Sequence, residues 1–193
     1  METDKQIDQA NEVATIALET TKRIYDLVFT VLETMSEDIA AQLNLKRETS
    51  WGRMDSRFIN RYGTLSTSEI AVLRRYVYAN FTGTKARPLK DNIAPFILFS
   101  VATRKFSQKP ALIYGILRDI DWGAEQKMEI EPFMYEISER RREGVLEVSR
   151  VNVISQKGSA VVEFNSRSLF EITEESVGDI TKEIVDWFEE RLR

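Results

Sequence analysis

Hydrophobic residues recur at helical spacing over the first 45 residues of the chain. Between Ile7 and Leu45 the sequence contains neither Pro nor Gly, and its apolar or small positions fall three or four residues apart. This period places them on one face of an α-helix, and acidic residues recur on the opposite face. The pattern predicts one long amphipathic helix. Its apolar face consists of Ile7, Ala10, Ala14, Ala17, Ile24, Val28, Val31 and Met35, with Leu18, Tyr25, Leu32 and Ile39 in a second column.

Such a helix is long for a domain of this size. At about 1.5 Å per residue it would extend to roughly 60 Å, long enough to project and to pair with a second copy of the chain. A core helix packed on its own chain explains the broad face better, because the heptad positions include Thr21, Asp38 and Gln42. The residues expected at a self-association interface are Ile24, Val28, Val31 and Met35.

Two shorter helices are predicted after the long one. Residues 54–62 and 67–80 have helical spacing and are separated by a turn at 63–66. An extended connection at Arg87-Pro88 follows. Together with the first helix, these elements predict a helical region over residues 1–92.

The second half of the chain changes to short apolar runs typical of strands. Residues 95–106 and 111–122 form one such pair, and residues 145–154 and 159–172 form another. The short polar connections suit hairpins. We therefore predict an α+β fold in which residues 93–193 form a mostly antiparallel sheet with a C-terminal helix. The helical half packs on this sheet in one compact unit.

Residues 128–143 fit two structures. Alternation at Met128 and Ile130 favours a strand, which is the interpretation we prefer, whereas Pro132 equally suits the start of a helix that ends at Gly144. The final helix is expected to begin with Asp179 as its N-cap and to bury a face that includes Ile180, Ile184 and Leu192.

Composition narrows the chemistry open to the chain. Its 193 residues include no Cys and no His, which excludes thiol nucleophiles, Ser-His-Asp triads, zinc fingers and other His- or Cys-ligated metal sites. A metal site would need oxygen ligands, as Mg²⁺, Mn²⁺ and Ca²⁺ prefer. The sequence also lacks the glycine motifs of phosphate-binding loops. We expect no cofactor and favour a protein without enzymatic activity.

The hydropathy pattern gives no indication of a membrane protein. No apolar run approaches the roughly 18 residues of a spanning helix, and residues 1–12 lack the pattern of a secretory signal peptide. We expect a cytoplasmic protein.

Charge is unevenly distributed. Residues 1–45 hold 9 acids and 3 bases (net −6), residues 46–90 hold 3 acids and 10 bases (net +7), and residues 91–193 hold 19 acids and 14 bases (net −5). The basic segment, residues 46–90, also contains aromatic residues. Because basic side chains neutralise phosphates and aromatic rings stack on bases, nucleic-acid binding is the alternative function. Its expected residues are Arg53, Arg57, Arg61, Arg74, Arg75, Lys85 and Arg87.

A second explanation suits the same basic segment. Acid-rich stretches flank it on both sides, so its arginines can pair with acids of the folded chain or of a second copy. We prefer this internal pairing to nucleic-acid binding.

Asp119 and Asp121 are the best candidates for metal chemistry. Alternation along a strand would place both on one face, where two carboxylates can share Mg²⁺. With Glu125 and Lys127 the order resembles that of metal-dependent nucleases, but the three residues between Asp121 and Glu125 leave no room for the strand and turn of that pattern. A solvated strand end explains the same residues. A Mg²⁺-dependent hydrolase or nuclease is therefore the third hypothesis.

The leading hypothesis combines the long helix with the missing catalytic residue types. It describes a non-enzymatic interaction or assembly protein whose partner is a second copy of itself or another protein, with self-association through the first helix.

Overall fold

The computed structural model describes residues 2–51, 76–100, 110–121, 130–142, 150–155 and 158–193, and over these residues the chain is a mixed α+β protein. The predicted helix at 54–62 lies outside them. In chain order the elements are the helix α1 (Glu2–Leu43), the strands β1 (Lys46–Trp51), β2 (Tyr76–Thr82), β3 (Ala94–Ser100) and β4 (Ala111–Asp121), the helix α4 (Glu131–Arg142), the strands β5 (Arg150–Ser155) and β6 (Gly158–Ser168), the 3-10 helix η3 (Leu169–Glu171) and the helix α5 (Val177–Arg191).

The described strands form one antiparallel sheet in the order β1-β2-β3-β4-β6-β5. The predicted pairing of the runs that begin at 95 and 111 is confirmed by β3 and β4. The predicted pairing of the later two runs is confirmed by β5 and β6, whose ladder closes at Ser155 and Gly158. Within the predicted helical region 1–92, however, β1 and β2 are strands of this same sheet.

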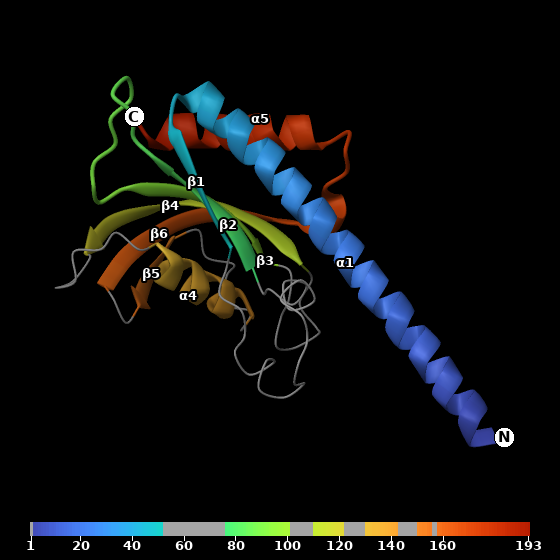
Figure 1. Cartoon of the computed structure of the whole chain (residues 1–193). Coiled ribbons are helices and arrows are strands. Elements are labelled where there is room, and N and C mark those ends of the chain that lie inside the picture. The colour runs from blue at the N-terminus through green and yellow to red at the C-terminus, as the bar shows by residue number, and fades with distance from the viewer. Residues whose placement is uncertain (1, 52–75, 101–109, 122–129, 143–149, 156–157) are drawn as a thin grey trace.

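Helices cover both faces of the sheet. Figure 1 shows α1 and α5 on one face and α4 on the other. Successive residues of the central strands therefore enter different cores: Val77, Ala79 and Phe81 of β2 face α1 and α5, whereas Tyr76 and Tyr78 face α4. Because both faces are covered, β2, β3 and β4 are almost continuously buried.

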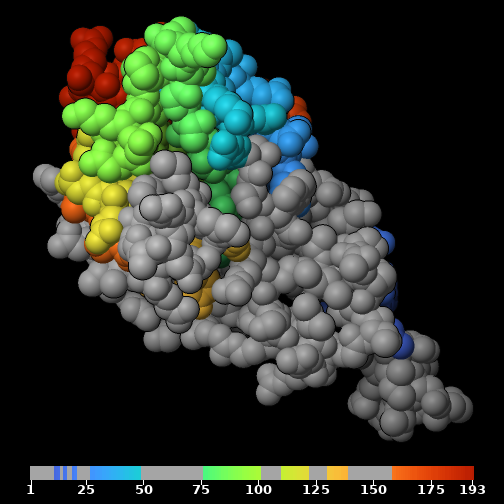
Figure 2. Space-filling view, turned by 60° about the vertical axis from the view of Figure 1, so that its left-hand side comes forward, coloured from blue at the N-terminus to red at the C-terminus, as the bar shows by residue number. Residues whose placement is uncertain are grey.

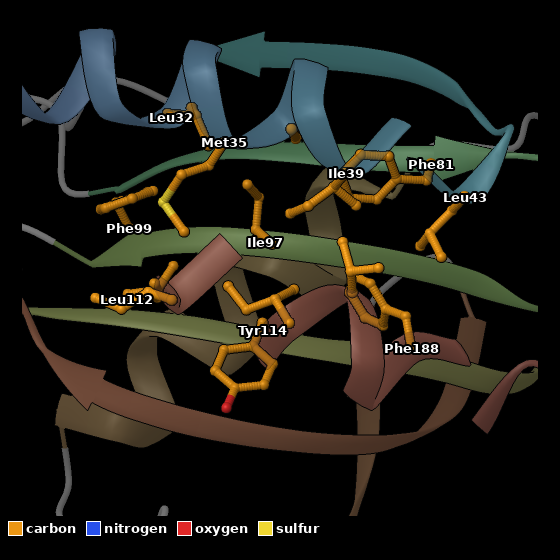
Figure 3. Close-up of a cluster of buried hydrophobic side chains, with 14 of the residues drawn as sticks. Leu32, Met35, Ile39, Leu43, Phe81, Ile97, Phe99, Leu112, Tyr114 and Phe188 are labelled. Carbon is orange, nitrogen blue, oxygen red and sulfur yellow. The ribbon is translucent and has the colours of Figure 1, made fainter. Parts of the chain in front are cut away.

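The larger core lies between the sheet, α1 and α5. Leu32, Met35 and Ile39 of α1 point toward the sheet, as Figure 3 shows. From α5, Phe188 meets the ring of Phe81 edge-on, with ring centres 6.0 Å apart. These contacts attach the second half of α1 to the rest of the chain.

Strand β2 corrects the prediction of a helix over 67–80. Residues 76–80 are extended and pair with both β1 and β3; residues 67–75 lie outside the described part. A short apolar run that is buried on both faces loses the alternation that distinguishes strand from helix. The Tyr, Val and Phe side chains of β2 favour a strand, since branched and aromatic residues pack well on a pleated surface.

Helix α4 corrects the preferred interpretation of 128–143 as a strand. Pro132 lies in its first turn, where a missing backbone N–H costs no hydrogen bond. The N–H groups of Phe133 and Met134 donate to the carbonyl of Ile130, and Phe133, Met134 and Ile137 are buried against the sheet. The burial follows helical spacing, so the alternation that suggested a strand ends at Ile130.

Helix α5 confirms the predicted C-terminal helix, with a different start. It begins at Val177, and Asp179 lies in its first turn, where its charge suits the helix dipole, instead of at the N-cap. Ile180, Ile184 and Phe188 form its buried face. Among the described helices, none has the combination of length and apolar sequence needed to cross a membrane.

Candidate self-association surface on helix α1

Helix α1 changes its surroundings along its length. From Val28 to Leu43 its apolar face packs on the sheet and α5. Figure 1 shows the preceding part of the helix extending beyond the sheet. We name residues 2–27 the projecting segment.

Three large apolar side chains are exposed on the projecting segment. Val13, Ile16 and Leu27 expose 67%, 55% and 51% of their surface. Among the other side chains whose exposure the structure describes, Phe170 of η3 is the one large apolar side chain that is exposed. Single exposed apolar residues are ordinary on protein surfaces, but three on one helical segment indicate a contact surface.

Val13 and Leu27 belong to a column with seven-residue spacing. The column continues through Thr20, Thr34 and Ala41, and all five side chains are exposed, even where α1 packs on the sheet by its other side. In the sequence, Ala17, Ile24 and Val31 each follow a member of the column by four residues. Alternating steps of four and three residues are the spacing of a helix-pairing seam. We name Val13, Thr20, Leu27, Thr34 and Ala41 the exposed column.

The predicted interface residues only partly match this surface. Val28 and Met35 are buried under the chain's own sheet, and Val31 is partly buried against the same core. Val28 and Met35 are therefore unavailable to a partner, which corrects their assignment to self-association, whereas Val31 keeps part of its side chain exposed and stays a prediction. The side chain of Ile24 lies outside the described part. The prediction missed Val13, Ile16 and Leu27, although the spacing of Val13, Thr20 and Leu27 was a signal present in the sequence.

The C-terminal end of α1 is held by hydrogen bonds. The helix ends with Asn44 in the left-handed conformation (φ 52°), and the N–H of Leu45 donates to the carbonyl of Ala40 at 2.9 Å. This arrangement satisfies carbonyls that the last helical turn leaves without partners. Thr84, in the loop after β2, donates through Oγ1 to the carbonyl of Asn44 at 2.8 Å.

Basic side chains surround this end of α1. Arg47 lies 3.0 Å from the carboxylate of Glu37 and donates to the side chain of Ser36 at 3.1 Å. Arg87 donates to the carbonyl of Leu43 at 3.1 Å and lies 3.0 Å from a carboxylate oxygen of Glu189 in α5. In Figure 2 the green loop after β2 lies beside the cyan end of α1. Cations at this position also complement the negative end of the helix dipole.

The candidate nucleic-acid residues are mostly beyond the described part. Arg87 pairs internally, as the preferred explanation of the basic segment requires, and Lys85 is exposed in the same loop. Nucleic-acid binding stays a prediction. The remaining candidates, Arg53, Arg57, Arg61, Arg74 and Arg75, lie outside the described residues.

A bulge interrupts strand β4 at the two candidate metal ligands. Asp119 has φ 50°, and the register between β4 and β6 shifts between Arg118 and Asp121. Ile120 consequently enters the α4-side core together with Leu117, so the strict alternation assumed for Asp119 and Asp121 is broken. Over the described residues no three acidic side chains lie close enough to hold a metal ion. The Mg²⁺ site stays a prediction without support from this geometry.

A polar cluster between α5 and the sheet was not anticipated from the sequence. The hydroxyl of Tyr114 donates to Glu183 at 2.7 Å and accepts from Asn165 at 2.9 Å, while Arg167 lies 2.6 Å from the same carboxylate group. Burial raises the pKa of Tyr114 well above its ordinary value, and the hydrogen bond to Glu183 raises it further. The hydroxyl is therefore neutral and holds α5 to the sheet instead of acting as a base.

Neighbouring contacts extend this attachment. Trp187 meets the ring of Tyr114 edge-on at 5.5 Å, and the guanidinium of Arg191 lies 4.3 Å from the centre of the Trp187 ring. Arg191 also pairs with Glu163 of β6 at 2.8 Å. These groups are paired with one another, so the cluster fixes α5 on the sheet.

Comparison with known proteins identifies no relative. Neither the models of known families, nor the curated proteins, nor the solved structures include a match to this chain. Its function is accordingly inferred from the geometry of α1.

Proposed function

We propose that this chain is a non-enzymatic assembly protein that pairs with a second copy of itself through the exposed column of α1. The exposure of Val13, Ile16 and Leu27 on the projecting segment carries the proposal. Water-exposed apolar side chains at helix-pairing spacing are covered when two such helices associate. A second copy supplies an identical column and so is the simplest occupant.

The expected affinity is moderate. Fully burying a Val, Ile or Leu side chain contributes about 1.5–3 kcal/mol, and the three side chains of each copy are already partly covered. Association costs at least about 4 kcal/mol in lost translational and rotational freedom. We therefore expect a homodimer that dissociates on dilution near roughly micromolar concentration.

Sedimentation velocity over a range of protein concentrations tests the proposal. The wild-type chain should sediment as a dimer at high concentration, and the double variant Val13→Gln/Leu27→Gln should have a dissociation constant at least about tenfold higher, because each Gln leaves a polar group in the seam. Gln is a good helix former, so α1 should stay intact, as circular dichroism would verify.

Phe170→Gln is the matched control. It removes an equally exposed apolar side chain from a different element, η3, and should leave the dissociation constant unchanged. A wild-type chain that is monomeric at every concentration would overturn the proposal. An equal loss of association in Phe170→Gln would indicate unspecific hydrophobic contact instead of pairing through α1.

A further inference from the structure

The charge of α1 differs between its two ends. Residues 2–12 hold four acids and one base, a net charge of −3 at the free tip of the projecting segment. At the opposite end, cations and acids are closer to balance. The fold brings Lys46, Arg47, Lys85 and Arg87 together there from β1 and the loop after β2, and three of them pair with acids of the same chain: Lys46 with Glu48, Arg47 with Glu37 and Arg87 with Glu189.

The charges at the two ends of α1 constrain the direction in which two copies of the helix can pair. A parallel pair would place two acidic tips side by side, so that like charges repel within about one Debye length, roughly 8–10 Å. It would also align the two helix dipoles. An antiparallel pair would avoid this repulsion, because each acidic tip would lie beside the charge-balanced end of the other helix, where Lys46 and Lys85 are exposed, and it would oppose the dipoles.

The surface of α1 leaves room for the antiparallel pair. The exposed column continues past the projecting segment to Thr34 and Ala41, beside the half of the helix that packs on the sheet. The tip of a partner can therefore run along this column as far as the end where Lys46 and Lys85 are exposed. The two folded bodies would then lie at opposite ends of the helix pair, where they do not compete for the same space.

We infer that the two copies of α1 pair antiparallel, with the acidic tip of each beside Lys46 and Lys85 of the other. This inference rests on the proposed self-association and adds its direction. Lys46 is a suitable partner because its side chain is 68% exposed although it pairs with Glu48 at 3.5 Å. Lys85 is exposed in the adjacent loop.

Distances between spin labels at identical positions in the two copies test the direction. The chain contains no Cys, so a single introduced Cys is the only labelling site. Glu12→Cys, Glu19→Cys and Glu33→Cys suit the purpose, because all three side chains are exposed on one column of α1 and each variant removes the same charge. Each is labelled separately in the full chain and measured by pulsed electron resonance.

The two directions give different distance patterns. In a parallel pair the three distances are equal, whatever the stagger between the helices. In an antiparallel pair the axial separation grows by about 3 Å for each residue away from the midpoint, since each helix rises about 1.5 Å per residue. No midpoint makes the three distances equal, and we expect at least two of them to differ by about 10 Å or more.

Each result of the distance and sedimentation measurements supports or overturns the antiparallel pair. Unequal distances support the antiparallel pair. Three equal short distances would overturn the direction while leaving self-association through α1 intact. A dimer in sedimentation with no measurable label-to-label distance would show pairing through another surface, and a monomer would show no pairing. Either result would overturn the proposed function as well as its direction.

Discussion

The two halves of α1 share one helical period and differ in the size and placement of their large side chains. On the sheet-facing side, the second half presents Val28, Leu32, Met35, Ile39 and Leu43, all buried. The same spacing continued toward the N-terminus meets Ile24, Tyr25 and Leu18 and then changes to alanines, at Ala17, Ala14 and Ala10. Three further large apolar residues of the first half lie to one side of this face, at Val13, Ile16 and Leu27, where they are exposed.

This difference separates two kinds of amphipathic surface. Large side chains bury enough apolar area to fix a helix on a sheet, whereas a stripe of alanines buries little. The spacing of the apolar residues indicates a helix but does not distinguish its two halves. The size of the residues along each column indicates whether that part of the helix packs on the chain's own sheet. The second half is covered by the chain itself, and the first half is the part for which we propose a second copy.

Truncating one Ile in each half tests the comparison most strongly. Ile39 is fully buried, so Ile39→Ala should reduce the free energy of unfolding by about 2–5 kcal/mol through lost burial and the cavity left behind. Ile16 is 55% exposed, so Ile16→Ala should change it by less than about 0.5 kcal/mol at concentrations where the chain is monomeric. Urea unfolding monitored by circular dichroism measures both.

Measuring the same two variants over a range of protein concentrations tests dimerisation separately from monomer stability. Ile16→Ala should weaken dimerisation even though it leaves monomer stability unchanged, because Ile16 lies beside the exposed column. Similar losses of monomer stability in Ile16→Ala and Ile39→Ala would show that both halves are covered within one chain, and the contrast between them would be wrong.

Substituting Arg87 should change the free energy of unfolding less, and it tests how the C-terminal end of α1 is held. Arg87→Ala removes the hydrogen bond to the carbonyl of Leu43 and the ion pair with Glu189. Both contacts are partly screened by solvent, so we expect a loss of about 1 kcal/mol in the free energy of unfolding. Arg87→Lys should recover only part of it, because Nη1 makes both contacts and the shorter Lys side chain ends before the position of that nitrogen.

Lys85→Ala is the matched control for this loop. It removes a nearby exposed cation and should leave unfolding unchanged. If Arg87→Ala and Lys85→Ala reduce the free energy of unfolding equally, Arg87 contributes through the net charge of the loop and not through its specific contacts with Leu43 and Glu189.

The accuracy of the sequence predictions follows the physical strength of each signal. The β3–β4 and β5–β6 pairs are recoverable because each combines two apolar runs with a short polar connection. β2 was missed because burial on both faces removes alternation, and the same continuous burial fits a helix. α4 was misassigned because two alternating positions before Pro132 were extended into a segment whose own spacing is helical.

The candidate sites show which structural features cannot be predicted from sequence patterns. Alternation predicted one face for Asp119 and Asp121, and a single left-handed residue in a bulge breaks it. The partners of Arg47 and Arg87 depend on tertiary contacts between distant segments, so charge counting could favour internal pairing but could not say which acids take part. The exposed column was present in the sequence, but it can be distinguished from the buried stripe only once the sheet is in place.

An effect of similar size is expected at Tyr114, which holds α5 beside the buried half of α1. Burial, strengthened by the hydrogen bond to Glu183, raises the pKa of Tyr114 above the unfolded value of about 10. A raised folded-state pKa means that the stabilisation is complete below about pH 10 and is lost as the pH rises further, because the unfolded chain releases the proton first. Tyr114→Phe should therefore reduce the free energy of unfolding by about 0.5–1.5 kcal/mol at pH 7.

The same substitution should have a pH signature that a loss of packing would not have. Between about pH 9 and pH 11 the wild-type chain should lose more stability than Tyr114→Phe, so the difference between them should shrink as the pH rises. Tyr135, partly buried on α4 at the opposite face, provides the control, because Tyr135→Phe should leave the alkaline loss of stability in place. A constant difference between wild type and Tyr114→Phe across this pH range would mean that the hydroxyl is not held neutral by its surroundings, and that Trp187 and the apolar core alone keep α5 beside α1.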